Sequence, residues 1–189
     1  MNTDTLIANM IRAAKLDVDF FNAVEHDESK NSEALMVVII AAIANAIGSG
    51  LGGLFAGGLT KGLFFAVLGL LGVLAGYYIW AYLTYFIGTK FFDGKADVGE
   101  VLRTFGYAQS PRILGILGFI PCIGWIIPLA ASIWALVASI IAIREAMDFD
   151  TTKAILTSLI AWAIMTIFFM ILGGILGMGT MGLNAIMSG

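Results

Sequence analysis

Charged side chains are scarce in this sequence. Only 12% of its 189 residues are Asp, Glu, Lys or Arg, whereas soluble domains carry about 25%. A soluble protein of this length could not cover its surface with so few charges, and 60% of the residues are hydrophobic. The composition therefore predicts an integral membrane protein. The net charge of −3 also argues against nucleic-acid binding, which needs a concentrated basic surface.

The residues of common catalytic and metal sites are equally scarce. Cys122 is the single cysteine and His26 the single histidine, so an intrachain disulfide is excluded and no ligand set has metal-site spacing. Cys122 also lacks a basic neighbour that would favour its thiolate. The sequence contains no phosphate-binding loop, no nucleophile elbow and no paired carboxylates within an apolar run. We therefore expect no enzyme activity, no cofactor and no metal.

The longest uncharged run covers the thirty-one residues between Arg112 and Arg144. It is long enough to cross a bilayer twice if the turn is tight. Two of the three prolines, Pro121 and Pro128, lie in this run with Gly124 between them. These residues predict a turn between two antiparallel spans, and the weaker alternative is one bent helix.

The other apolar runs predict three further spans. The expected fold class is all-α: a polytopic membrane protein with five transmembrane helices and an N-terminal amphipathic interfacial helix. The membrane domain covers 33–189, with spans at about 34–55, 63–87, 105–121, 125–143 and 154–176. Residues 57–61 are expected to connect the first two spans. Aromatic residues around Trp80 indicate a headgroup boundary rather than a ligand cage, and a solvated connection follows at 90–103, with a short helix from Val98.

Residues 1–32 are expected to form a cytoplasmic amphipathic helix followed by a polar linker. The apolar residues recur at helical spacing and share one face: Leu6, Ile7, Met10, Ile11, Ala14, Val18, Phe21 and Val24. Such a helix either lies in the membrane interface or packs on the protein's own loops, and the pattern leaves both interpretations open.

The basic residues predict the orientation in the membrane. With five spans and a cytoplasmic N-terminus, nine of the ten Lys and Arg residues lie inside, and Lys61 alone lies outside. This asymmetry follows the positive-inside rule. We therefore expect the C-terminus to lie outside.

Small and polar residues within the spans are candidates for helix packing. Glycines recur at a spacing of four residues in and near the spans, and Gly72 with Gly76 and Gly173 with Gly177 are examples within spans. Glycine at this spacing lets two helix backbones approach closely, either within the monomer or at a subunit interface. Asn45 in the first span is expected to make a hydrogen bond between helices rather than to serve permeation.

The segment GYAQSP, Gly106 to Pro111, resembles the Gly-Tyr-x-x-x-Pro signature of the Yip family, the Ypt/Rab-interacting membrane proteins. The resemblance continues with an Arg-Glu pair after the fourth span and a Lys-Ala pair at the start of the last. It looks most like the compact prokaryotic members. The residues that match the family motifs are Gly106, Tyr107, Pro111, Arg144, Glu145 and Lys153.

The resemblance implies a polytopic protein without known catalytic chemistry, in the prokaryotic cytoplasmic (inner) membrane. Eukaryotic relatives are associated with Rab GTPases and vesicle traffic. Their long cytoplasmic N-terminal region has no counterpart in this sequence, so GTPase binding is doubtful. Arg144 and Glu145 form either a polar site with Lys153 and the 103–112 segment or anchors that reach the headgroups.

We therefore expect a membrane scaffold or adaptor that acts through helix packing and cytoplasmic loops, in membrane organisation or trafficking-like processes. Its partners would be the lipid bilayer and either further copies of itself or another membrane protein. The alternative is an oligomeric channel or small-solute permease, suggested by the glycine-rich helices and the uncharged outer face. The spans lack the charged or broken midplane segments that mark ion paths, which argues against this alternative.

Overall fold

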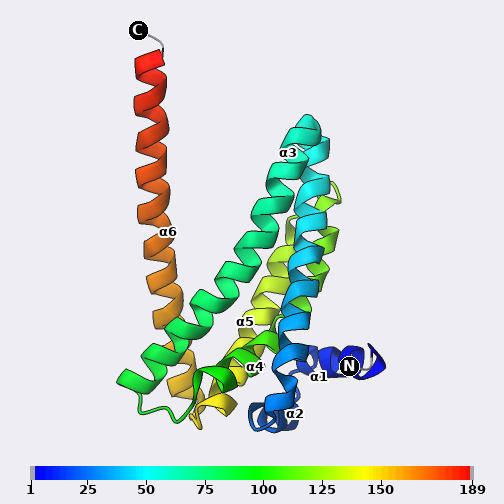
Figure 1. Ribbon diagram of the computed structural model, residues 1–189, viewed down its shortest axis with the longest axis vertical. Coiled ribbons are helices and arrows are strands. Elements are labelled where there is room, and N and C mark those ends of the chain that lie inside the picture. The colour runs from blue at the N-terminus through cyan, green and yellow to red at the C-terminus, as the bar shows by residue number, and fades with distance from the viewer. Residues whose placement is uncertain (1–2, 188–189) are drawn as a thin grey trace.

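The longest element of the computed structural model is α3 (Asn31–Phe91), which folds back on itself as a hairpin (Figure 1). The structure describes the backbone of residues 3–187 and the side chains of 3–171, except Ala56 and Phe169. Within this range every regular element is helical. The expected all-α class is therefore confirmed.

The hairpin of α3 turns at two glycines, inside the connection expected at 57–61. Gly57 has φ −175° and ψ 23°, and Gly58 has φ 81° and ψ −173°. The positive φ of Gly58 lies where side chains other than glycine are strained. Below the turn the two arms approach closely, because a Cβ added to Gly62 would lie 3.0 Å from the carbonyl oxygen of Gly50. Glycine therefore serves both the turn and the packing of the two arms.

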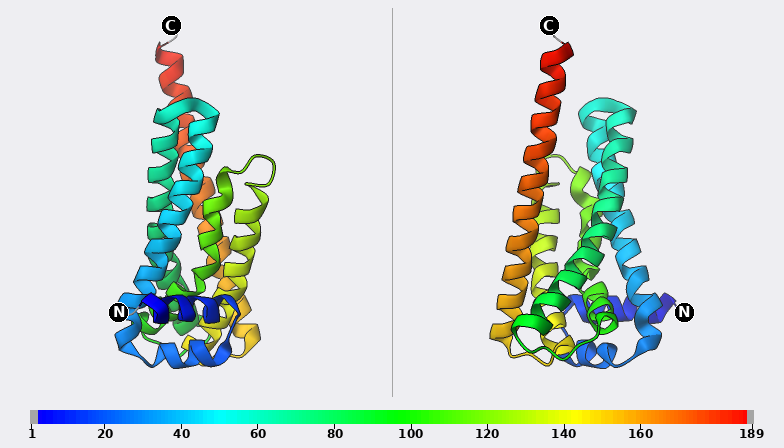
Figure 2. Two further views of the ribbon diagram at one scale, coloured as in Figure 1. Left: turned by 90° about the vertical axis from the view of Figure 1, so that its right-hand side faces the viewer. Right: turned by 60° about the vertical axis from the view of Figure 1, so that its left-hand side comes forward.

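The elements at one end of the molecule form a platform that we call the base. It consists of α1 (Thr3–Ala14), α2 (Val18–Glu25), the 3₁₀-helix η1 (Glu28–Lys30), α4 (Val98–Ala108) and the connections 92–97 and 147–150. Figure 2 shows α1 and α2 lying across this end, roughly perpendicular to the long helices.

The N-terminal segment forms two helices, so the prediction of a single amphipathic helix is wrong. Leu16 has a positive φ of 61°, and Asp17 then caps α2 by accepting a hydrogen bond from the Phe20 N–H. The apolar face is also divided. Leu6 and Phe21 are buried, whereas Ile7 and Ile11 are about half exposed.

The third expected span, 105–121, differs most from the structure. Phe105 to Ala108 end the base helix α4, and residues 110–119 form a 3₁₀-helix, η2 (Ser110–Phe119). The helix η2 lies against α3, where a Cβ on Gly48 would collide with the carbonyl oxygen of Gly115. A narrow helix with glycine at the contact lets the two backbones meet this closely.

The last two helices complete the molecule. The helix α5 (Ile126–Ala146) runs back to the base after the turn at 120–125, and α6 (Thr151–Met187) begins with Asp150 accepting a hydrogen bond from the Lys153 N–H. Figure 1 shows α6 standing away from the other long helices beyond its first turns. Its contact face near the base consists of small residues: Ala154, Thr157, Ser158 and Ala161.

Four helical segments within the described residues are long and apolar enough to cross a membrane: Glu28–Phe55, Gly57–Phe91, Ile126–Ala146 and Thr151–Phe168. They correspond to the first, second, fourth and fifth expected spans. The segment through η2 is not among them, so the five-span topology stays a prediction.

Candidate functional site

The first motif residue, Gly106, lies where α4 crosses α3. A Cβ added to Gly106 would lie 3.0 Å from both the Cβ and the carbonyl oxygen of Ala34. Ala34 is itself buried. Only a residue without a side chain lets the two helices meet at this distance, so Gly106 sets the position of α4 against α3.

Tyr107 connects α4 to the N-terminal helices. Its side chain is fully buried, and its ring packs edge-on against Phe20 at a centroid distance of 5.0 Å. Its hydroxyl group lies beside the Glu33 carboxylate, which accepts hydrogen bonds from Asn9 (2.6 Å) and Lys30 (3.0 Å). Tyr107 thereby helps to join α1, α2, α3 and α4.

Pro111, the last residue of the GYAQSP motif, starts η2 beside α1. It is buried, and it lines a pocket with Ile7 and Ile11 of α1 and with Trp134 of α5. The indole N–H of Trp134 donates a 2.8 Å hydrogen bond to the carbonyl oxygen of Ala14. The motif therefore joins α4 and η2 to the N-terminal helices.

Arg103 is a buried arginine that we expected in a solvated connection, and that expectation is wrong. It is only 4% exposed. Its guanidinium donates to the carbonyl oxygen of Glu25, where α2 ends, and to the Asn31 side chain at 3.3 Å, where α3 begins. Sequence spacing could not reveal this role, because both partners lie more than seventy residues away.

Arg144 and Glu145 form an ion pair at the end of α5, with a closest distance of 2.6 Å. Nearby, Glu25 is almost fully buried and its Oε1 lies 3.2 Å from His26 Nδ1. Burial raises the pKa of Glu25 to about 7, and the carboxylates of Asp148 and Glu145 act in the same direction. The base therefore contains a carboxyl group that titrates near neutral pH.

Lys153, in the first turn of α6, lies beside the connections 92–97 and 147–150. Its ammonium donates a 3.1 Å hydrogen bond to the carbonyl oxygen of Phe92 and lies 5.8 Å from the centre of the Phe149 ring. Among the described residues no ion pair joins Lys153 to Glu145. The structure thus shows two separate clusters, which disfavours the joint polar site that was one of the two alternatives for these residues.

Asn45 makes the predicted hydrogen bond between elements, donating to the carbonyl oxygen of Arg112 at 3.0 Å. A Cβ added to Gly72 or Gly76 would meet nothing within 4 Å, so these two glycines mark no close contact with the residues whose side chains are described. Gly173 and Gly177 lie outside the residues whose side-chain surroundings are described.

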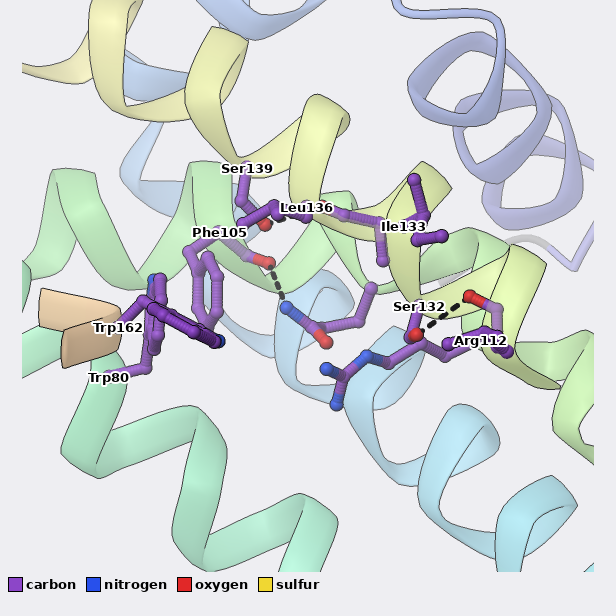
Figure 3. Close-up of a pocket in the computed structure, with 11 residues that line it drawn as sticks. Trp80, Phe105, Arg112, Ser132, Ile133, Leu136, Ser139 and Trp162 are labelled. Atoms are coloured by element: carbon purple, nitrogen blue, oxygen red, sulfur yellow. Dashed lines mark hydrogen bonds between the residues drawn. The ribbon is translucent and has the colours of Figure 1, made fainter. Parts of the chain in front are cut away.

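A cavity of about 440 Å³ lies above the base, between η2, α5 and the second arm of α3. Its lining combines aromatic and polar side chains: Trp80, Phe105, Gln109, Arg112, Ser132 and Trp162. Figure 3 shows Arg112 on one side of the cavity, with its guanidinium directed toward the rings of Trp80, Phe105 and Trp162. The sequence pattern indicated neither the cavity nor a role for Arg112.

In the part of the chain that the structure describes, no group of three or more His, Cys, Asp and Glu side chains could hold a metal ion. Cys122 is free and exposed at the η2–α5 turn.

Comparison with known proteins agrees with the motif. Residues 17–172 match the Yip1 domain family, a range that includes every motif residue described above. No curated protein and no solved structure matches the chain. Because the match covers most of the sequence and confirms the resemblance carried by Gly106 to Pro111, the chain belongs to the Yip1 domain family.

Proposed function

We propose that this membrane protein is an adaptor of the prokaryotic cytoplasmic membrane, and that it presents its base to a partner in the cytoplasm. The observation that carries the proposal is the construction of the base. The contacts of Gly106, Tyr107 and Arg103 hold the helices α1, α2, α3 and α4 against one another. A surface that is already ordered loses little conformational entropy on binding.

The charge of the base indicates the class of partner. Seven carboxylates on it are exposed: Asp4, Asp19, Glu28, Asp93, Asp97, Asp148 and Asp150. Fewer cations are exposed at this end of the molecule: Arg12, Lys15, Lys90 and Lys95. An acidic surface is repelled by anionic lipid headgroups and attracts basic segments. We therefore infer a partner with a basic cytoplasmic segment.

Site-specific photo-crosslinking in intact cells tests this proposal. A photo-reactive amino acid replaces Asp19 or Lys95, which are exposed on the base, and Leu59 at the far tip of the α3 hairpin serves as the control. We expect crosslinked partners from the two base positions and none from Leu59. Crosslinks only from Leu59 would refute the adaptor role of the base.

A charge-neutralising variant makes the test specific. Asp93 and Asp148 both have positive φ, at 58° and 53°, a conformation that Asn tolerates. The Asp93→Asn/Asp148→Asn variant should keep its fold and give weaker crosslinks. In membranes opened to the medium, raised salt should weaken crosslinking of the wild type in the same way. Crosslinks that resist both changes would contradict a basic partner.

A channel or small-solute permease is the second candidate, and one observation favours it. The cavity around Arg112 places polar side chains, including Gln109 and Ser132, among the long apolar helices. Flux of ions and small solutes through liposomes that contain the purified protein tests this function. Flux no greater than that of empty liposomes would exclude it.

A further inference from the structure

Two hydrogen-bond donors beside the Arg112 cavity have no acceptor. Among the described residues the Nε of Arg112 and the indole Nε1 of Trp80 are both buried without a hydrogen-bond partner, and both side chains line the cavity. A buried donor left without an acceptor costs roughly 1–3 kcal/mol, and more if it is charged. Two such donors beside one cavity indicate that a bound acceptor completes the site.

The other polar groups of the cavity already donate their hydrogen bonds. The Gln109 amide donates to the carbonyl oxygen of Phe105 at 3.3 Å, Ser132 to Leu129 at 2.8 Å and Ser139 to Ala135 at 2.6 Å. No Asp or Glu lines the cavity. The guanidinium of Arg112 therefore has no carboxylate partner among the described residues, and an arginine fork matches phosphate and carboxylate groups.

The space beyond Arg112 is apolar and continues between two helices. A second cavity, of about 260 Å³, shares Trp80, Arg112 and Trp162 with the first and extends along α3 and α6 past Gly76 and Met165. Trp162 is 55% exposed. A hydrocarbon chain could lie along this path with its polar end at Arg112, since the path leads from the guanidinium to the outer surface of the long helices.

The contacts of α1 place Arg112 near the headgroup level of a bilayer. The exposed Ile7 and Ile11 of α1 lie beside Pro111 and Ile113, which flank Arg112 in the sequence. A helix that exposes apolar residues on one side is suited to the membrane interface. Trp134, bonded to the end of α1, is of the residue type enriched at that depth.

We propose that the Arg112 cavity binds the anionic phosphate or carboxylate group of an amphiphile. Arg112 and Trp80 donate hydrogen bonds to the anionic group, and the apolar chain lies against Phe105, Trp162 and the α3–α6 cavity. This site is separate from the acidic surface of the base and does not depend on the adaptor function.

Native mass spectrometry of the full chain in detergent tests the proposal with three probes: phosphatidylglycerol, phosphatidylcholine and inorganic phosphate. We expect tighter binding of phosphatidylglycerol than of phosphatidylcholine, which carries the same phosphate but no net charge. Inorganic phosphate should compete weakly because it lacks the apolar chain. Equal binding of the two lipids, or free phosphate competing as effectively as phosphatidylglycerol, would overturn the assignment.

Substitutions of Arg112 and Trp80 test whether these side chains donate the hydrogen bonds to the bound lipid. Arg112→Gln should weaken phosphatidylglycerol binding tenfold or more, as expected for losing a charge-assisted hydrogen bond, and Trp80→Phe should weaken it severalfold while keeping an aromatic ring. The matched controls are Lys90→Gln, which removes a cation outside the cavity, and Trp134→Phe, which removes an indole N–H bonded elsewhere.

The controls should bind as the wild type does. If Arg112→Gln melts at a clearly lower temperature, Trp80→Phe decides the question. Wild-type affinity in a folded Trp80→Phe or Arg112→Gln protein would refute the site.

Discussion

The side-chain amide of Asn45 in α3 donates a 3.0 Å hydrogen bond to the main-chain carbonyl of Arg112 in η2. Its second N–H donates to the carbonyl oxygen of Ala41 at 2.9 Å, so both donors are satisfied where water is scarce. The bond sets the position of η2 along α3. It thereby holds the backbone of the arginine whose side chain enters the cavity.

Packing around this bond predicts a compensating pair of substitutions. A Cβ on Gly115 would lie 2.5 Å from Asn45 Oδ1, so Gly115→Ala should lower the free energy of unfolding by about 1–3 kcal/mol. Asn45→Ala should cost about 1 kcal/mol through the lost hydrogen bond. In the double variant the new methyl group occupies the space that the amide leaves. Melting in detergent should show a double-variant loss smaller than the sum of the two single losses, and strict additivity would contradict the contact.

A glycine at a close helix contact and a glycine in open space should respond oppositely to substitution by alanine. Gly106→Ala forces α4 away from Ala34 and should lower the stability by about 1–3 kcal/mol. Gly72→Ala enters open space and should raise it by about 0.5–1 kcal/mol, because glycine is the poorer helix former. Thermal melting of both variants beside the wild type checks the pair. If Gly72→Ala lowers the melting temperature as much as Gly106→Ala does, Gly72 faces a partner in the assembled protein.

The raised pKa of Glu25 predicts a pH dependence of stability. The folded protein holds this proton up to about pH 7, whereas the unfolded chain releases it near the ordinary pKa of 4.5. Folding therefore binds the extra proton between these values, and stability falls as the pH rises through that window. The loss attributable to Glu25 should be about 1–3 kcal/mol at pH 8.

Glu25→Gln, which carries no charge, should flatten this dependence and melt higher than the wild type at pH 8. His26 contributes with the same sign, because its hydrogen bond to the Asn22 carbonyl and the neighbouring Glu25 raise its pKa. The variant His26→Asn separates the two groups. An unchanged pH slope in Glu25→Gln would show that Glu25 is not the titrating group.

Cys122 is a built-in probe of topology. It is the single cysteine of the chain and lies exposed at the turn between η2 and α5. If the η2–α5 hairpin crosses the whole membrane, as the five-span topology requires, a membrane-impermeant maleimide added outside intact cells should label Cys122. Cys122→Ser provides the unlabelled control. Labelling only after the membrane is opened would show that neither η2 nor α5 crosses the membrane, and this would refute the five-span topology.

Short-range features were predictable from the sequence. The turn at Gly57 and Gly58, the start of α4 at Val98 and the start of α6 after Asp150 follow from glycine conformations and from side chains that cap nearby N–H groups. Membrane class followed from hydropathy, and the family from the order of Gly106, Tyr107 and Pro111.

The amino-acid sequence by itself thus determined that the chain is a helical membrane protein of the Yip family, because hydropathy, turns and caps act between residues close in the chain. Only the tertiary structure decided that η2 is a 3₁₀-helix, that Arg103 joins α2 to α3 and that Arg112 faces a cavity with no Asp or Glu among the described residues that line it. The physical reason is the uniformity of the long apolar runs. When every face of a helix is apolar, the sequence has no hydrophobic periodicity that identifies the packed face. Contacts between distant segments then determine which face packs.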